Sequence, residues 1–148
     1  MESILLYGSE TWTFTAELTS RVDGVYTRLL RFCLNVSWRD TWTNKKLYHG
    51  LPKVSEKIRS RRLKLAGHCV RHGVKEDVDS ESVEVAGSLV LWEPTQGKRR
   101  QGGQYLTYVD QLKRDTGLTD VSEIRSMMLE RDTWRCQTDT RVRLRRPV

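Results

Sequence analysis

The chain has 148 residues, of which 26 are Lys or Arg and 19 are Asp or Glu, so its formal net charge is +7. This length fits one domain with a core of its own, and no apolar run reaches the roughly 20 residues that a bilayer span needs. The N-terminal residues lack the basic start of a signal peptide, and the three cysteines (Cys33, Cys69 and Cys136) are too few for a disulfide framework. We therefore expect a soluble, basic, intracellular protein without a membrane span.

The first long helix is predicted over residues 16–34. Thr15 is a suitable N-cap, and Asn35 offers a stop. The apolar residues of this segment fall in one arc at about 100° per residue; they are Leu18, Val22, Val25, Tyr26, Leu29, Leu30, Phe32 and Cys33. A short helix over residues 43–49, ended by Gly50, is expected next.

A second long helix is predicted over residues 52–72, with Pro52 in its first turn. One side carries Val54, Ile58, Leu65 and Cys69. The opposite side carries a stripe of basic residues at helical spacing, which are Lys57, Arg61, Lys64, His68, Arg71 and Lys75. Arg59 and Arg62 fall within the apolar arc, so each must reach solvent, an acid or a phosphate.

The middle of the chain, residues 73–103, breaks the helical pattern. The acidic stretch 76–84 is predicted to be a loop, and the apolar run 85–92 is predicted to be a strand or a turn. Lys98, Arg99 and Arg100 then form a second basic patch on a glycine-rich loop.

Two more helices are predicted in the C-terminal third. The first, residues 104–116, ends at Gly117, and its packing face is Tyr105, Tyr108, Val109 and Leu112. The second, residues 121–136, begins after Asp120 in a sequence like a capping box, and its apolar side is Ile124, Met128 and Trp134. The basic tail 141–146 is expected to fray. The fold class is thus mainly α, a small bundle of about four helices with an irregular acidic and basic middle segment.

Charge is concentrated in blocks. Residues 51–75 hold eight basic side chains and one acidic, whereas residues 76–95 hold six acidic and none basic. A helix face that only contacts water usually mixes signs to gain pairs between neighbouring turns. The unmixed stripe predicts a polyanionic partner, with these residues as the nucleic-acid contacts: Lys53, Lys57, Arg61, Lys64, His68, Arg71, Lys98, Arg99 and Arg100. The alternative is that the charge serves solubility alone.

Signals for catalysis or metal binding are weak. His68 and Cys69 are adjacent on a helix and point about 100° apart, so Cys69 is predicted to be a core residue. His68 and His72 have a spacing that allows zinc binding, but a closed zinc site needs four ligands. The acids at 76–84 lack the rigid pocket of a Mg²⁺ site, and residues 97–103 lack the P-loop spacing. We predict no catalytic residue, no metal site and no cofactor.

Several short motifs then occur in a recognisable order. They are Leu6-Tyr7-Gly8-Ser9-Glu10-Thr11-Trp12, Val36-Ser37-Trp38-Arg39-Asp40, Leu51-Pro52 with Ser55-Glu56-Lys57-Ile58, Gly67-His68, Gly97-Lys98-Arg99-Arg100, Leu112-Lys113-Arg114-Asp115 and Arg131-Asp132-Thr133-Trp134-Arg135. This ordered set resembles the region that follows the palm in reverse transcriptases of non-LTR (LINE-type) retrotransposons. It covers about residues 4–136, and it departs from the family at Gly103-Gln104, where Arg-Pro is usual, and at Leu65-Ala66.

The resemblance implies a division into three parts. Residues 1–75 would be a post-palm, thumb-like helical region, residues 76–103 a charged linker, and residues 104–148 a C-terminal helical pair with a basic tail. The Tyr-x-Asp-Asp motif of the palm does not occur in the sequence. The resemblance therefore implies a truncated piece of an RNA-directed DNA polymerase that grips the template–primer backbone without doing chemistry, in which Mg²⁺ belongs to the full-length enzyme only.

Two alternatives remain open. The chain could be a stand-alone or domesticated DNA- or RNA-binding module, or an inert remnant whose apolar faces pack on the palm domain of the parent polymerase. Exposure of Ile4, Leu5, Leu6 and Trp12 would favour the remnant. A nuclear location is expected if the chain is functional.

Overall fold

The computed structural model describes residues 2–72, 81–93, 102 and 106–139 of the chain. Within these ranges the protein is mainly helical without a strand, which confirms the predicted fold class, but it has eight α-helices rather than about four. They are α1 (Glu2–Leu5), α2 (Ala16–Cys33), α3 (Asn44–Tyr48), α4 (Val54–His72), α5 (Glu81–Val90), α6 (Tyr108–Thr116), α7 (Val121–Leu129) and α8 (Arg131–Thr138), with 3-10 turns η1 (Ser9–Thr11) and η2 (Trp38–Asp40). In the described part of the chain, no helix is long and apolar enough to cross a membrane.

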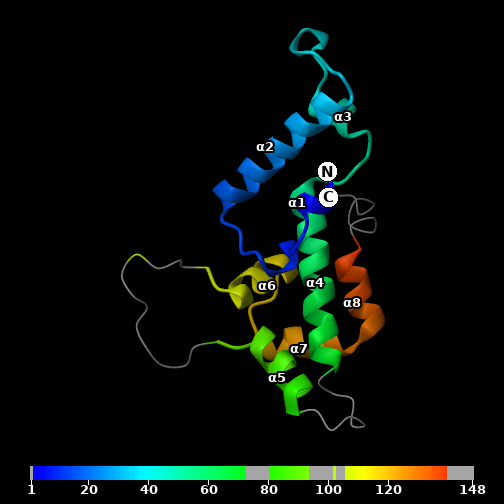
Figure 1. Ribbon diagram of the computed structural model, residues 1–148. Coiled ribbons are helices and arrows are strands. Elements are labelled where there is room, and N and C mark those ends of the chain that lie inside the picture. Colours follow the sequence, from blue (N-terminus) through cyan, green and yellow to red (C-terminus); the bar gives the residue numbers. More distant parts are fainter. Residues whose placement is uncertain (1, 73–80, 94–101, 103–105, 140–148) are drawn as a thin grey trace.

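Helix α4 is the centre of the fold. It runs through the middle of the molecule, with α8 beside it and α5 and α7 near its C-terminal end, while α2 runs toward α3 and packs on the N-terminal half of α4 (Figure 1). Its buried residues occupy several sides of the helix, as expected for an element covered by many neighbours. The buried surface of α4 is therefore wider than the predicted apolar side, whereas none of the described residues of the basic stripe is buried.

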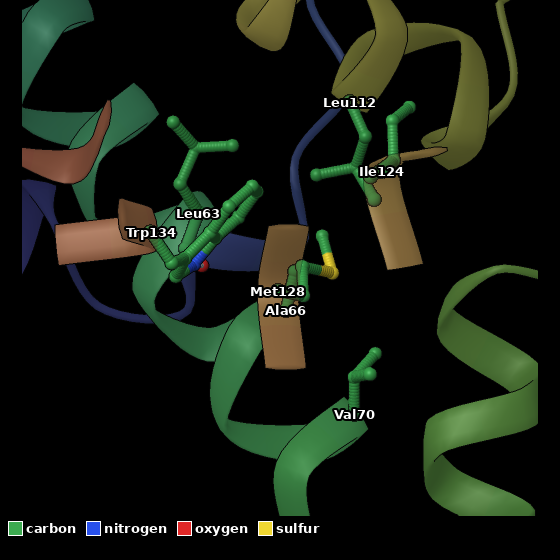
Figure 2. Close-up of a cluster of buried hydrophobic side chains, with 7 residues drawn as sticks. All are labelled: Leu63, Ala66, Val70, Leu112, Ile124, Met128 and Trp134. Atoms are coloured by element: carbon green, nitrogen blue, oxygen red, sulfur yellow. Dashed lines mark hydrogen bonds between the residues drawn. The ribbon is translucent and has the colours of Figure 1, made fainter. Parts of the chain in front are cut away.

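Two hydrophobic clusters share α4. The first joins its C-terminal half to α6, α7 and α8, and Figure 2 shows the indole of Trp134 lying against Leu63, with Met128 beside Ala66. Its buried residues are Leu63, Ala66, Val70, Leu112, Ile124, Met128 and Trp134. The second joins the N-terminal half of α4 to α1 and α2 through Leu6, Tyr26, Val54 and Ile58. The three apolar residues predicted for the segment after Asp120 are all buried, which confirms that prediction.

The predicted bounds of the helices between residues 16 and 72 agree with the structure to within two residues. The hydroxyl of Thr15 accepts a hydrogen bond from the backbone of Leu18 at the start of α2, and Asn35 adopts a left-handed conformation after its end. Helix α3 ends at Tyr48 and is followed by His49 and Gly50, both with positive φ. Gly117 is the left-handed cap of α6. The helix begins at Tyr108, after the N-cap Thr107, whose capping box with Asp110 the prediction missed.

Helix α5 contradicts the prediction of an irregular middle segment. Residues 81–90, predicted as the end of an acidic loop and the start of a strand or turn, form a helix that packs closely on α4. A Cβ atom at Gly87 would lie 3.2 Å from the carbonyl oxygen of Cys69, so the glycine allows this close approach. Periodicity cannot identify a short apolar run as strand or helix, and the packing on α4 decides it here.

A break at Glu130 divides the predicted helix 121–136 into α7 and α8. Glu130 is extended and serves as the cap of both helices. In one continuous helix, Met128 and Trp134 would point about 120° apart, since each residue turns the helix by about 100°. The break lets both side chains enter the same core, which explains why the single predicted helix is wrong.

A buried polar network joins the N-terminal segment to α4 and α6. The guanidinium of Arg62, only 2% exposed, donates to the carboxylate of Asp115 and, at 3.0 Å, to the backbone carbonyl of Trp12. Gln111 donates to the same carboxylate at 3.1 Å and accepts from the backbone of Phe14. Arg59 donates to the carbonyl oxygen of Asp115 at 3.1 Å. Both arginines thus reach an acidic residue, as the prediction required.

Candidate nucleic-acid interface

The packing of α8 on α4 creates the strongest candidate site. Gly67 provides the room, because a Cβ atom there would overlap the indole of Trp134 at Nε1. That indole nitrogen donates a hydrogen bond of 2.8 Å to the carbonyl oxygen of Leu63. The glycine and the hydrogen bond together fix the distance and the register between the two helices.

A groove of about 440 Å³ lies along this contact. Its polar lining comes from Lys64, His68 and Arg71 of α4 and from Arg131 and Arg135 of α8. Trp134 and Thr138 complete the wall, and the lining residues within the described ranges include no carboxylate. We refer to these seven residues as the basic groove. Four permanent positive charges and an imidazole thus lie together among the described lining residues.

The pKa of Arg71 reflects both its burial and the positive charge of its neighbour in the groove. Its Nη1 atom donates to the backbone carbonyl of Met128 at 2.7 Å, which holds the side chain against α7. Burial, followed by the positive charge of Arg131, lowers the pKa of the Arg71 guanidinium below its usual value. A bound anion would offset this repulsion, because opposite charges nearby favour the ionised form of a cation.

The two histidines of α4 lie against each other. The rings of His68 and His72 are 4.4 Å apart in an edge-to-face arrangement, which follows from their spacing of one turn. Within the described part of the chain, no three His, Cys, Asp or Glu side chains gather closely enough to hold a metal ion. His68 therefore contributes to the site as part of the wall of the basic groove.

The other predicted contacts on α4 lie elsewhere. Lys57 forms an ion pair of 2.7 Å with Glu2 and donates to the hydroxyl of Tyr26 at 3.1 Å. Arg61 donates to the backbone carbonyl of Leu6 at 2.9 Å. Lys53 is exposed before the first turn of α4 and lines a separate hollow between α2 and α3. The six α4-region candidates thus divide into three that meet in the groove and three that do not.

The pKa values of the Glu2–Lys57 pair agree with a structural role. Burial acts to lower the pKa of the Lys57 ammonium, but hydrogen bonds to Glu2 and Tyr26 outweigh it, and the pKa is raised. The hydrogen bond from Lys57 lowers the pKa of the Glu2 carboxyl. Each partner therefore favours the charged form of the other, and this lysine ties α1 and α2 to α4.

The second predicted patch cannot be placed. Lys98, Arg99 and Arg100 lie outside the described residues, as do Lys75 at the end of the basic stripe, Tyr105 and the tail 141–146.

Sequence reasoning missed Arg131 and Arg135 as members of the site. Arg131, Trp134, Arg135 and Thr138 have the spacing i, i+3, i+4 and i+7, which places all four within one arc of a helix. Two arginines beside a buried tryptophan on such an arc indicate a basic edge next to a helix contact. The prediction of one helix over residues 121–136 drew attention to its apolar side, Ile124, Met128 and Trp134. The arc of Arg131 and Arg135 becomes distinct only when residues 131–138 are treated as a separate helix.

Neither a protein-family model, nor a curated protein, nor a solved structure matches this chain.

Proposed function

We propose that the chain binds the sugar–phosphate backbone of nucleic acid through the basic groove. The observation that carries the proposal is the meeting of Lys64, Arg71, Arg131 and Arg135 without a carboxylate among the described lining residues. Such an arrangement costs free energy in the free protein, since like charges repel and Arg71 loses hydration. Binding of a row of phosphates would offset this repulsion and release counterions that are condensed on the nucleic acid.

The ordered motifs support a more specific role within this class. They resemble the thumb and C-terminal region of a LINE-type reverse transcriptase, in which the chain would hold the template–primer duplex and be located in the nucleus. Residues of two of these motifs, Gly67-His68 and Trp134-Arg135, have an identifiable physical role in the structure. Gly67 and Trp134 set the contact between the helices, and His68 and Arg135 line the groove that results.

No catalytic step is proposed for the chain by itself. Two-metal polymerisation needs palm carboxylates that hold Mg²⁺, and the 148 residues contain no Tyr-x-Asp-Asp motif. Nucleotide incorporation by the purified chain would contradict this part of the proposal.

A stand-alone nucleic-acid-binding module is the second candidate. Leu6 is buried, Leu5 and Trp12 are half-buried, and only Ile4 of the four residues tested by the remnant hypothesis is exposed. The N-terminal segment thus packs on its own α4 through the contacts of Leu6 and Trp12 with Arg61 and Arg62. This observation favours a chain that folds by itself over a remnant that needs the palm domain.

Charge removal tests the proposal directly. We expect the double variant Arg131→Gln/Arg135→Gln to bind a fluorescently labelled primer–template duplex at least roughly 100-fold more weakly than the wild type, since two hydrogen bonds to charged groups, of about 1.5–3 kcal/mol each, are lost. The matched control is Arg114→Gln/Arg125→Gln, which removes two exposed arginines that do not line the groove. Circular dichroism checks that both variants fold. Equal affinities of the two double variants would overturn the proposal.

A further inference from the structure

The connection between α2 and α3 presents aromatic rings to solvent at the far end of the molecule. Figure 1 shows this segment projecting away from the helices around α4. Trp38 in η2 is 82% exposed, and Phe32 in the last turn of α2 is 80% exposed. Burial of such large apolar side chains is normally favourable, so a segment that leaves two of them open to solvent is a candidate contact surface.

The segment is nevertheless well defined. After α2, the backbone N–H of Val36 donates to the carbonyl of Arg31 at 2.9 Å, which closes the helix end. Ser37 and Asp40 form a capping box around η2, in which the Asp40 carboxylate accepts from the backbone of Ser37 at 2.6 Å. These bonds hold Trp38 on a structured turn.

A further anchor lies where the segment joins α3. The Arg31 guanidinium donates to the carbonyl of Trp42 at 3.0 Å and to the side chain of Asn44 at 3.1 Å. The two ends of the connection are thereby tied to each other. Binding of a ligand to the exposed rings would therefore carry a smaller entropic cost than binding to a flexible loop.

Each tryptophan of this segment has a cation beside its ring. The guanidinium carbon of Arg39 lies 5.4 Å from the ring centre of Trp38, and the ammonium nitrogen of Lys46 lies 4.4 Å from that of Trp42. Neither cation forms an ion pair within the described ranges. Residues 28–46 contain five basic side chains and the single acid Asp40, whose carboxylate serves the capping box. The segment therefore combines open ring surface with uncompensated positive charge.

We propose that this segment is a second nucleic-acid site, which binds a single strand by stacking a base on the open face of Trp38. Arg39 lies on one face of that ring, and Lys46 and Arg39 contact the flanking phosphates. Stacking on an aromatic ring beside cations is how single strands are bound without sequence preference. The proposal rests on the proposed function for its ligand class, but it uses a different surface from the basic groove.

The chemistry of the segment favours this ligand over a protein or a lipid surface. A protein-docking patch is typically apolar at its centre, and charged residues are depleted there. Here each tryptophan of the segment has a cation beside its ring instead. A membrane interface also accepts Trp with Arg or Lys, and the experiment below includes that outcome.

The test compares Trp38→Ala, Trp38→Phe and the matched control Trp92→Ala, which removes a tryptophan that is 63% exposed next to α5. The probes are a labelled 20-nucleotide oligothymidylate and a blunt duplex of the same length. We expect Trp38→Ala to weaken single-strand binding roughly 5- to 150-fold, as the loss of one stacked base does. Trp38→Phe should retain most of the affinity, and duplex binding should stay unchanged in all three variants.

Three outcomes would overturn the inference. One is an equal single-strand affinity of Trp38→Ala and Trp92→Ala, and another is an equal loss for both probes. The third is a Trp38-dependent binding of phosphatidylserine vesicles without any effect on the oligothymidylate, which would identify a membrane contact instead. A failure of the proposed function would be recognised separately. The Arg131→Gln/Arg135→Gln variant tests duplex binding by the basic groove and leaves Trp38 in place.

Discussion

Individual charged residues in this protein are satisfied by partners that are distant in the sequence. Arg62 donates to the carbonyl of Trp12 and to the carboxylate of Asp115, so one guanidinium joins segments about 50 residues away on either side. Lys57 finds its acid in Glu2. Sequence reasoning could state that a charge in an apolar arc needs a partner, but long-range folding decides which partner it finds.

Tyr108 provides a pH-dependent test of the same buried region. Its hydroxyl donates to the backbone carbonyl of Glu10 at 3.3 Å. Burial raises its pKa from 10.0 to about 12, although the positive charge of Arg62 acts against this shift. Because the phenol ionises at lower pH in the unfolded chain, its contribution to stability is present below pH 10 and is lost as the pH rises to about 12.

We therefore expect Tyr108→Phe to lose less stability than the wild type between neutral pH and pH 12. The difference in the free energy of unfolding should be roughly 2 kcal/mol, measured by urea unfolding across this range. Comparison of the two proteins at each pH removes the contribution of Lys57, whose raised pKa also causes a loss of stability in alkali. The same alkaline loss in both proteins would show that Tyr108 stays accessible to water.

Pairs of helices determine what the charged side chains can do together. The basic groove exists because Gly67 lets α8 approach α4 until Trp134 reaches the backbone of Leu63. Arg131 and Arg135 then come to lie opposite Lys64, His68 and Arg71. The helix contact is thus the step that converts a basic stripe into a concave site.

Gly67→Ala tests this contact. The added methyl group would overlap the indole of Trp134, which is buried and hydrogen-bonded, so we expect a loss of roughly 2–4 kcal/mol in the free energy of unfolding. The matched control is Gly24→Ala on α2, where no atom lies within 4 Å of the new Cβ atom. This change should stabilise the protein by about 0.5–1 kcal/mol, since alanine favours a helix. Equal effects in thermal or urea unfolding would contradict the packing described for α8.

The sequence is sufficient to predict the elements whose signals are local. Thr15, Asn35 and Gly117 mark helix ends by their own side chains or conformations, and they lie where expected. Helix α5 and the break at Glu130 depend on packing against α4, so no local pattern identifies them. For the same reason, the six α4-region candidates could be listed from the sequence but could not be sorted into groove residues and structural residues.

At the scale of the whole molecule, the 26 basic side chains have different roles. Some are paired with acids inside the fold, as Lys57 is with Glu2 and Arg62 with Asp115. Others converge in the basic groove, and others lie beside the rings of the α2–α3 connection. This distribution is what we expect of a protein that holds a polyanion at defined places on its surface.

The dependence of duplex affinity on salt concentration tests this view most directly. Each phosphate contact contributes about 0.9 to the slope of the logarithm of the binding constant against the logarithm of the salt concentration. We predict that Arg131→Gln/Arg135→Gln lowers the magnitude of this slope by about 2 relative to the wild type, whereas Arg114→Gln/Arg125→Gln leaves it unchanged. A slope that is the same in the wild type and in both variants would contradict a phosphate-binding role for the basic groove.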